Sequence, residues 1–364
     1  MTTTERINRC APFAFCLQTL ELPHRRKLSA VLMEIRSQPI TSLNLIRTKF
    51  YRPRVGAELV HRSRLIDLLD RGRELPLTLV SAPAGSGKTT LLSDWLASCP
   101  CPSAWLSLDE GDGDLAVFLH YLIAAIRTIA PGACEQTLAL LQAAELPPLR
   151  VLAGTLINEI EDLADQPALA EGKRLVLVLD DYHLVTGQAI NELLIEILRH
   201  PPQTLRLVLA TRSDPALSLA NLRARGQVLE IRRHELRFSV AETQVFLDRS
   251  IKAPVSQDVV AFLTEQMEGW ITGLHLAALS LRDRSASDRV AFVNAFSGSQ
   301  RFIVDFLSEE VLGQQPESVR DFLLMTSIPG RLCGPLCEAL LEPDGALPGW
   351  GQAQLESLER QNLF

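Results

Sequence analysis

The chain has 364 residues, of which 47% are hydrophobic and 22% are charged, a composition typical of a globular protein with more than one compact unit. Its net charge of −7 argues against a nucleic-acid surface as the dominant feature, because binding to phosphate backbones requires clustered lysine and arginine. The 7 cysteines are scattered without an obvious secretory signal, which predicts reduced thiols in the cytoplasm, and the apolar runs are too short to span a membrane.

The N-terminal part of the chain divides into two regions of different pattern. Residues 1–45 show no sustained hydrophobic period, and we predict a weakly ordered extension there. Residues 59–69 place apolar side chains at the spacing of an amphipathic helix, which we expect to lead into the first domain. This helix could form a wall of a base-binding pocket or serve only in packing, and the spacing of its apolar residues does not decide between these two roles.

The stretch from Leu77 to Leu92 runs from an apolar strand pattern through a loop of small residues into a helical pattern. The loop fits G-x-x-x-x-G-K-[ST] at every fixed position except the first, where Ala82 replaces glycine. Small residues let successive backbone N–H groups surround a phosphate, and the following helix directs its positive end toward the same anion. We expect Lys88 to hold the β- and γ-phosphates and Thr89 to ligate Mg²⁺. The predicted nucleotide-binding residues of this loop are Ala82, Pro83, Ala84, Gly85, Ser86, Gly87, Lys88, Thr89 and Thr90.

A second strand is predicted over residues 103–108, followed by an acidic cluster at 109–114 and a helix over 115–129. The acidic residues could touch Mg²⁺, but capping of the helix is the better interpretation because the first helical turn favours negative charge. Two further amphipathic stretches lie at residues 135–144 and 151–163.

Residues 174–181 form a continuous aliphatic run that ends in Asp180 and Asp181, as expected for a central parallel strand buried on both faces. Open α/β sheets bind their ligands at the C-terminal ends of the strands. We therefore predict that Asp180 holds Mg²⁺, directly or through water, and that Asp181 orients or deprotonates the attacking water. The next strand, over residues 205–212, ends in Arg212, which could contact the γ-phosphate or pair with Asp214; we favour the phosphate.

After a short helix over residues 219–227 and a strand over 228–231, the pattern becomes helical and stays so. Ser239 and Glu242 form a capping-box pattern at this change. The α/β domain is thus predicted to end near residue 236. In the last of the helices predicted after it, we expect the leucines to be exposed. The predicted later helices cover residues 240–250, 256–268, 271–282, 301–312, 317–327 and 351–361.

Several stretches together resemble the signal-transduction NTPases with numerous domains and, more closely, the MalT-like large LuxR-family transcriptional regulators. The resemblance extends from about residue 44 to residue 364. One departure is His275, which stands where the relatives have proline in a Gly-Leu-Pro-Leu-Ala helix start. Besides the phosphate loop, the resemblance rests on Arg52-Pro53, Val60-His61-Arg62, Ser107-Leu108-Asp109, Leu179-Asp180-Asp181-Tyr182-His183, the stretch from Ala220 to Gln227, and Glu268-Gly269-Trp270-Ile271-Thr272-Gly273-Leu274.

This resemblance implies a slow ATPase that serves as a switch between ADP and ATP states, with Mg²⁺ as cofactor. The intact protein would self-associate in the ATP state and would contact DNA only through a C-terminal helix-turn-helix that this chain lacks. The resemblance places Arg62 near the nucleotide, and assigns catalysis to Lys88, Asp181 and Arg212 and the metal to Thr89 and Asp180.

The implied fold class is an α/β P-loop NTPase, a parallel sheet with flanking helices, followed by an all-α helical lid and the start of a winged-helix domain. The expected domains are the extension over residues 1–45, the P-loop NTPase domain over 46–236, the helical lid over 237–312 and an incomplete winged-helix domain over 313–364.

Two other functions remain open from the sequence. One is a turnover enzyme such as a kinase for a small substrate, for which the helical half offers no cluster of lid arginines. The other is a nucleotide-binding scaffold without turnover. Four intact residues argue against it, namely Lys88, Thr89, Asp180 and Asp181.

Overall fold

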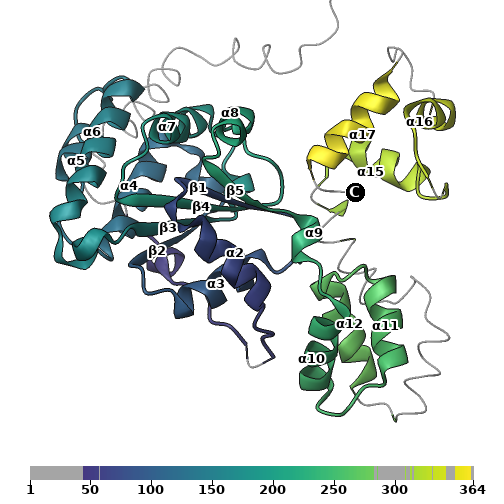
Figure 1. Cartoon of the computed structure of the whole chain (residues 1–364). Coiled ribbons are helices and arrows are strands. Elements are labelled where there is room, and N and C mark those ends of the chain that lie inside the picture. The colour runs from purple at the N-terminus through teal and green to yellow at the C-terminus, as the bar shows by residue number, and fades with distance from the viewer. Residues whose placement is uncertain are drawn as a thin grey trace, which may run out of the picture.

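The computed structural model describes residues 44–56, 58–282, 285, 308, 312, 313, 315–329, 331–341 and 349–361. Three groups of elements follow one another along the chain (Figure 1): an α/β unit, a helical unit made of α10 to α12, and a C-terminal group made of α15 to α17. Apart from its last two residues, the predicted N-terminal extension lies outside the described residues. No helix in these ranges is long and apolar enough to cross a membrane.

A 5-stranded parallel sheet in the order β2-β3-β4-β1-β5 forms the centre of the α/β unit. Every residue of β1, β3 and β4 is buried, in agreement with their nearly continuous apolar sequences, because helices cover both faces of the sheet. Each strand coincides with a predicted one to within a residue or two. The strands are β1 Leu77–Ser81, β2 Ser103–Ser107, β3 Leu175–Asp180, β4 Leu205–Thr211 and β5 Val228–Ile231.

Alternate strand residues point into two separate hydrophobic cores, as the two-residue period of a strand requires. Leu177 and Leu209 pack with α4, α6 and α7 on one face, whereas Val178 and Val208 pack with α2 and α3 on the other. The helices are α2 Ser63–Arg71, α3 Lys88–Ser98, α4 Leu115–Arg127, α5 Glu135–Leu141, α6 Leu149–Glu161, α7 Gln188–Arg199, α8 Leu219–Ala224 and α9 Arg233–Leu236. Short 3-10 turns lie at Arg47–Phe50, Gly72–Glu74, Glu110–Gly113, Asp162–Asp165, Pro167–Gly172 and Tyr182–Leu184.

The acidic cluster after β2 has two structural tasks. Asp114 caps α4, because its carboxylate accepts hydrogen bonds from the backbone nitrogens of Ala116 (2.9 Å) and Val117 (3.0 Å). Asp109 and Asp112 instead bind the ammonium of Lys49, each at 2.7 Å. The capping interpretation therefore applies to Asp114, whereas Asp109 and Asp112 form ion pairs that hold the beginning of the described chain at the sheet edge.

The helical unit comprises α10 Val240–Ile251, α11 Gln257–Gln266 and α12 Ile271–Leu281. The predicted capping box at its start is present: the backbone nitrogen of Glu242 donates to the Ser239 hydroxyl (3.2 Å), and that of Ser239 donates to the Glu242 carboxylate (2.8 Å). Leu247, Leu263 and Leu274 are fully buried in the core that joins the three helices.

The C-terminal group comprises α15 Glu317–Met325, α16 Gly334–Leu341 and α17 Trp350–Arg360. The sequence analysis missed α16, and most of the helix predicted over residues 301–312 lies outside the described residues. The expectation of exposed leucines in the last helix is wrong for Leu358, which is fully buried against Phe322 and Cys337, and Leu355 packs against the same cluster. Leu363 lies outside the described residues. The domain boundaries drawn from the resemblance stay predictions.

Candidate functional site

A cavity of about 570 Å³ lies beside the C-terminal end of β1, between the α/β unit and the helical unit. Its wall combines the loop and first turn at residues 84–91, residues 55, 56, 58–60 and 62 before α2, and side chains from α10 and α12. Asp181 and Arg212 contribute from the ends of β3 and β4. The cavity thus lies at the edge of the sheet where parallel α/β proteins bind ligands.

The phosphate loop has the backbone that its glycines predict. Gly85 and Gly87 have φ angles of 68° and 82°, in the left-handed region that a β-carbon disfavours. Ala82 keeps an ordinary negative φ and donates its backbone nitrogen to the carbonyl of Thr211 (3.2 Å), so alanine is tolerated at the first position of the motif. Helix α3 begins at Lys88 directly after the loop, and no side chain caps it. The first N–H groups of a helix have no partner within the helix and are therefore available to a ligand.

Lys88 is buried beneath the loop. Its ammonium donates to the carbonyl oxygens of Ala82 (2.8 Å) and Pro83 (2.9 Å). Burial, followed by repulsion from the Arg212 guanidinium, lowers the pKa of Lys88 to about 8, so the side chain is mostly protonated at pH 7. A buried cation held beside a phosphate loop attracts an anion electrostatically.

Asp180 and Thr89 form a direct contact between β3 and α3. The Thr89 hydroxyl donates to the Asp180 carboxylate at 2.9 Å. Burial, followed by the negative charge of Asp181, raises the pKa of Asp180 to about 6. This pair of hard oxygen donors is of the kind that Mg²⁺ prefers.

Asp181 and His183 follow directly after β3. Asp181 has a φ of 55°, and its side chain is 43% exposed and lines the cavity. The Nδ1 atom of His183 lies 4.0 Å from the Asp181 carboxylate and is buried without a hydrogen-bond partner. Burial, followed by the charges of Arg212 and Lys88, lowers the pKa of His183 to about 4, so its imidazole is neutral at pH 7.

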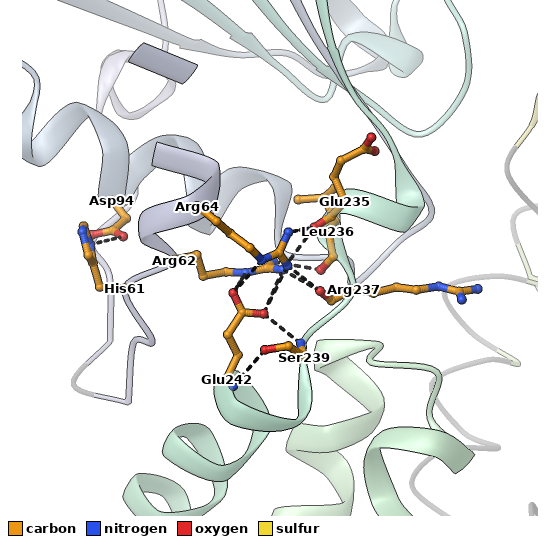
Figure 2. Close-up of polar contacts among 9 residues, drawn as sticks. All are labelled: His61, Arg62, Arg64, Asp94, Glu235, Leu236, Arg237, Ser239 and Glu242. Atoms are coloured by element: carbon orange, nitrogen blue, oxygen red, sulfur yellow. Dashed lines mark hydrogen bonds and ion pairs between the residues drawn. The ribbon is translucent and has the colours of Figure 1, made fainter. Parts of the chain in front are cut away.

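Arg62 lines the cavity, but its guanidinium is engaged elsewhere (Figure 2). It donates to the carbonyl oxygens of Leu236 and Arg237, both at 2.8 Å, and pairs with Glu242 at 3.3 Å. It also lies 4.4 Å from the ring centre of Phe238. In this structure Arg62 joins the start of α2 to the start of the helical unit, and its expected contact with a nucleotide stays a prediction.

Replacement of Arg62 by methionine is expected to lower the free energy of unfolding by roughly 2–4 kcal/mol, since a buried charge-assisted hydrogen bond to the Leu236 carbonyl and a partly buried one to the Arg237 carbonyl are lost. Arg64 is the matched control, because it bonds to the Glu235 and Arg237 carbonyls (2.7 Å each) and to Glu242, but its side chain is 44% exposed. Arg64→Met should cost less than about 1 kcal/mol. Urea unfolding followed by fluorescence measures both, and equal losses would contradict the role assigned to burial.

Most of the predicted site residues line the cavity, whereas Ala82, Pro83 and Asp180 do not. Asp180 contacts the cavity edge through Thr89, while Ala82 and Pro83 support the loop from behind by accepting from Lys88. The predicted residues that line the cavity are Arg62, Ala84, Gly85, Ser86, Gly87, Lys88, Thr89, Thr90, Asp181 and Arg212. The sequence analysis left open whether the segment with Leu59 and Val60 lines a base-binding pocket, and both residues line the cavity. It gave no site role to the other lining residues Val55, Gly56, Glu58, Phe238, Phe246, Ile271, Thr272 and His275.

These missed residues carry little local signal. Phe238 and Phe246 read as core positions of a helical unit, since nothing in their spacing indicates a ligand. The Gly-Trp-Ile-Thr-Gly stretch around Thr272 supports the family resemblance, but spacing alone does not place it beside a loop that lies 187 residues earlier.

The geometry fits a nucleoside triphosphate with Mg²⁺. The loop offers backbone N–H groups at positive-φ glycines, Lys88 offers a buried cation, and Thr89 with Asp180 offers metal ligands. Among the residues that the structure describes, no cluster of three or more histidine, cysteine, aspartate or glutamate side chains could hold a metal.

The fold and this site define a P-loop NTPase. The Walker-type ATPase of Pyrococcus abyssi has a similar solved structure, with a TM-score of 0.56 and 18% sequence identity over 85% of this chain and 92% of that chain. At this identity the likeness concerns the fold alone, and it confirms the predicted fold class.

The sequence comparisons are more specific. Residues 308–364 match the MalT winged helix domain. Over 320 residues, or 88% of this chain, the sequence is 37% identical to the HTH-type transcriptional regulator MalT of Yersinia pestis (strain Pestoides F) and of Yersinia enterocolitica serotype O:8. The resemblance to the MalT-like regulators is therefore confirmed. The chain spans 34% of the length of these relatives.

Proposed function

We propose that this chain is an ATP-binding and ATP-hydrolysing switch module of a MalT-type transcriptional activator. The observation that carries the proposal is the composition of the cavity wall, to which the α/β unit contributes Lys88 and Arg212 and the helical unit contributes Phe246 and His275. A nucleotide in this cavity would touch both units. It could then favour one arrangement of the two units over another, because a ligand shifts a conformational equilibrium by its different affinity for each state.

Each polar residue has a distinct proposed task. Lys88 binds the β- and γ-phosphates, and Arg212 stabilises charge on the γ-phosphate. Thr89 and Asp180 hold Mg²⁺, which neutralises phosphate charge when it is bound. Asp181 orients the attacking water and accepts its proton, and its partial exposure at the cavity wall leaves room for that water.

The wider function is likewise proposed from the relatives. They are named as HTH-type transcriptional regulators, and we propose that the complete protein acts in the cytoplasm, self-associates in its ATP state and binds DNA through a region beyond residue 364.

A kinase is the second candidate function. A kinase requires an acceptor substrate for ATP consumption, whereas a switch does not.

The whole chain is expected to bind ATP and ADP and to release phosphate slowly in the absence of any acceptor, because water is the nucleophile at Asp181. Calorimetry with each nucleotide and a phosphate-release assay with and without Mg²⁺ measure this. ATP consumption that appears only after an acceptor is added would indicate a kinase. Tight binding without any turnover would indicate a scaffold.

A further inference from the structure

The helical unit reaches the phosphate loop through the beginning of α12. The indole nitrogen of Trp270 donates to the carbonyl oxygen of Ala84 at 3.1 Å. The Thr272 hydroxyl donates to the carbonyl oxygen of Gly85 at 2.9 Å, and the Thr272 backbone nitrogen donates to the same oxygen at 3.3 Å. Three hydrogen bonds therefore link two consecutive loop carbonyls to residues that lie more than 180 positions later in the chain.

The loop and the helical unit are also in close steric contact at this point. A β-carbon added to Gly85 would lie 2.4 Å from the Thr272 hydroxyl oxygen and 3.1 Å from the indole nitrogen of Trp270. Gly85 is thus required for two reasons, its φ of 68° and the close approach of the helical unit. The helical unit can approach the loop this closely only because residue 85 has no β-carbon.

The planarity of the peptide bond relates these contacts to the phosphate site. In a trans peptide, the carbonyl of one residue and the N–H of the next lie in one plane and point in opposite directions. Bonds that fix the carbonyls of Ala84 and Gly85 toward the helical unit therefore fix the N–H groups of Gly85 and Ser86 in the opposite direction. Backbone N–H groups are the phosphate-binding groups of such a loop.

We propose that Trp270 and Thr272 are positioning residues that hold the phosphate loop in its phosphate-binding conformation, so that docking of the helical unit sets the affinity for nucleotide phosphates. The inference rests on the proposed nucleotide-binding function. Neither residue needs to touch the nucleotide for this role, because each acts through the orientation of a loop peptide.

Thr272→Val tests the proposal, because it removes the hydroxyl while keeping the size and branching of the side chain. The probes are ADP, which carries phosphates, and adenosine, which does not. Thr272→Val is expected to weaken ADP affinity about fivefold, the effect of losing one ordinary hydrogen bond, and to leave adenosine affinity unchanged. Trp270→Phe combined with Thr272→Val should weaken ADP affinity by more than about tenfold. Thr272→Ser keeps the hydroxyl and should therefore bind ADP with wild-type affinity.

Thr264→Val is the matched control, because the Thr264 hydroxyl donates to the Val260 carbonyl (2.7 Å) within α11 of the same helical unit. It should leave ADP affinity unchanged. Amide hydrogen exchange without nucleotide gives an independent readout: exchange at Gly85 and Ser86 should accelerate in Thr272→Val and should not change in Thr264→Val.

Two results would overturn the inference while leaving the nucleotide site intact: wild-type ADP affinity in the double variant, or equal losses for ADP and adenosine, which would indicate a general packing defect. A wild-type chain that binds neither ADP nor ATP would instead refute the proposed function, and the inference with it.

Discussion

Lys88→Ala is expected to weaken ATP affinity by at least about tenfold, because each charge-assisted hydrogen bond from its ammonium to phosphate contributes roughly 1.5–3 kcal/mol. The structure makes the prediction sharper than the sequence did. The ammonium is buried and already held by the carbonyls of Ala82 and Pro83, so it is fixed close to the loop before any ligand arrives. Calorimetric titration with ATP measures the loss.

The pKa of Lys88 offers a second measurement. Because that pKa is about 8, part of the population is neutral at pH 8, and an incoming phosphate should raise the pKa and draw a proton from the buffer. Titrations at pH 8 in buffers of different ionisation enthalpy should reveal this uptake in the wild type and not in Lys88→Ala. Lys173→Ala, at an exposed lysine outside the cavity, is the control. Unchanged ATP affinity in Lys88→Ala would refute the phosphate-loop assignment.

Asp181→Asn is expected to slow ATP hydrolysis by about 10²–10⁴-fold while sparing ATP binding, since a general base contributes about that much to a rate. Asparagine is the suitable replacement because the backbone φ of 55° at this position is one that asparagine and aspartate tolerate better than other side chains. A loss of activity in Asp181→Asn therefore reports on the carboxylate rather than on backbone strain. Phosphate release at saturating ATP measures the effect.

The control for charge removal is Asp67→Asn, at an exposed position on α2 outside the cavity, which should hydrolyse ATP at the wild-type rate. Asp180→Asn provides the contrast. Because Asp180 contacts Thr89, it should impair Mg²⁺-dependent binding and hydrolysis together. Wild-type hydrolysis in Asp181→Asn would show that another group activates the water.

The amino-acid sequence predicts those elements whose signal is local. The strands were found because each is a short apolar run, and the loop from Ala82 to Thr89 because its residue types follow one another at fixed spacing. Asp180 was placed near Thr89 because the C-terminal ends of parallel strands meet at one edge of a sheet, and their contact at 2.9 Å agrees with that reasoning. The Ser239 capping box was equally local.

Tertiary structure alone decided the contacts between elements that are distant in the sequence. Arg62 bonds to Leu236 across 174 positions, and Trp270 bonds to Ala84 across 186. Leu358 is buried because α16 supplies its partner Cys337, and the sequence of α16 shows no strong helical periodicity from which that helix could be predicted. Helical and strand periods report which face of an element is apolar, but they do not report which other element covers that face. The packing of the helical unit against the phosphate loop is such a pairing, and only the folded chain reveals it.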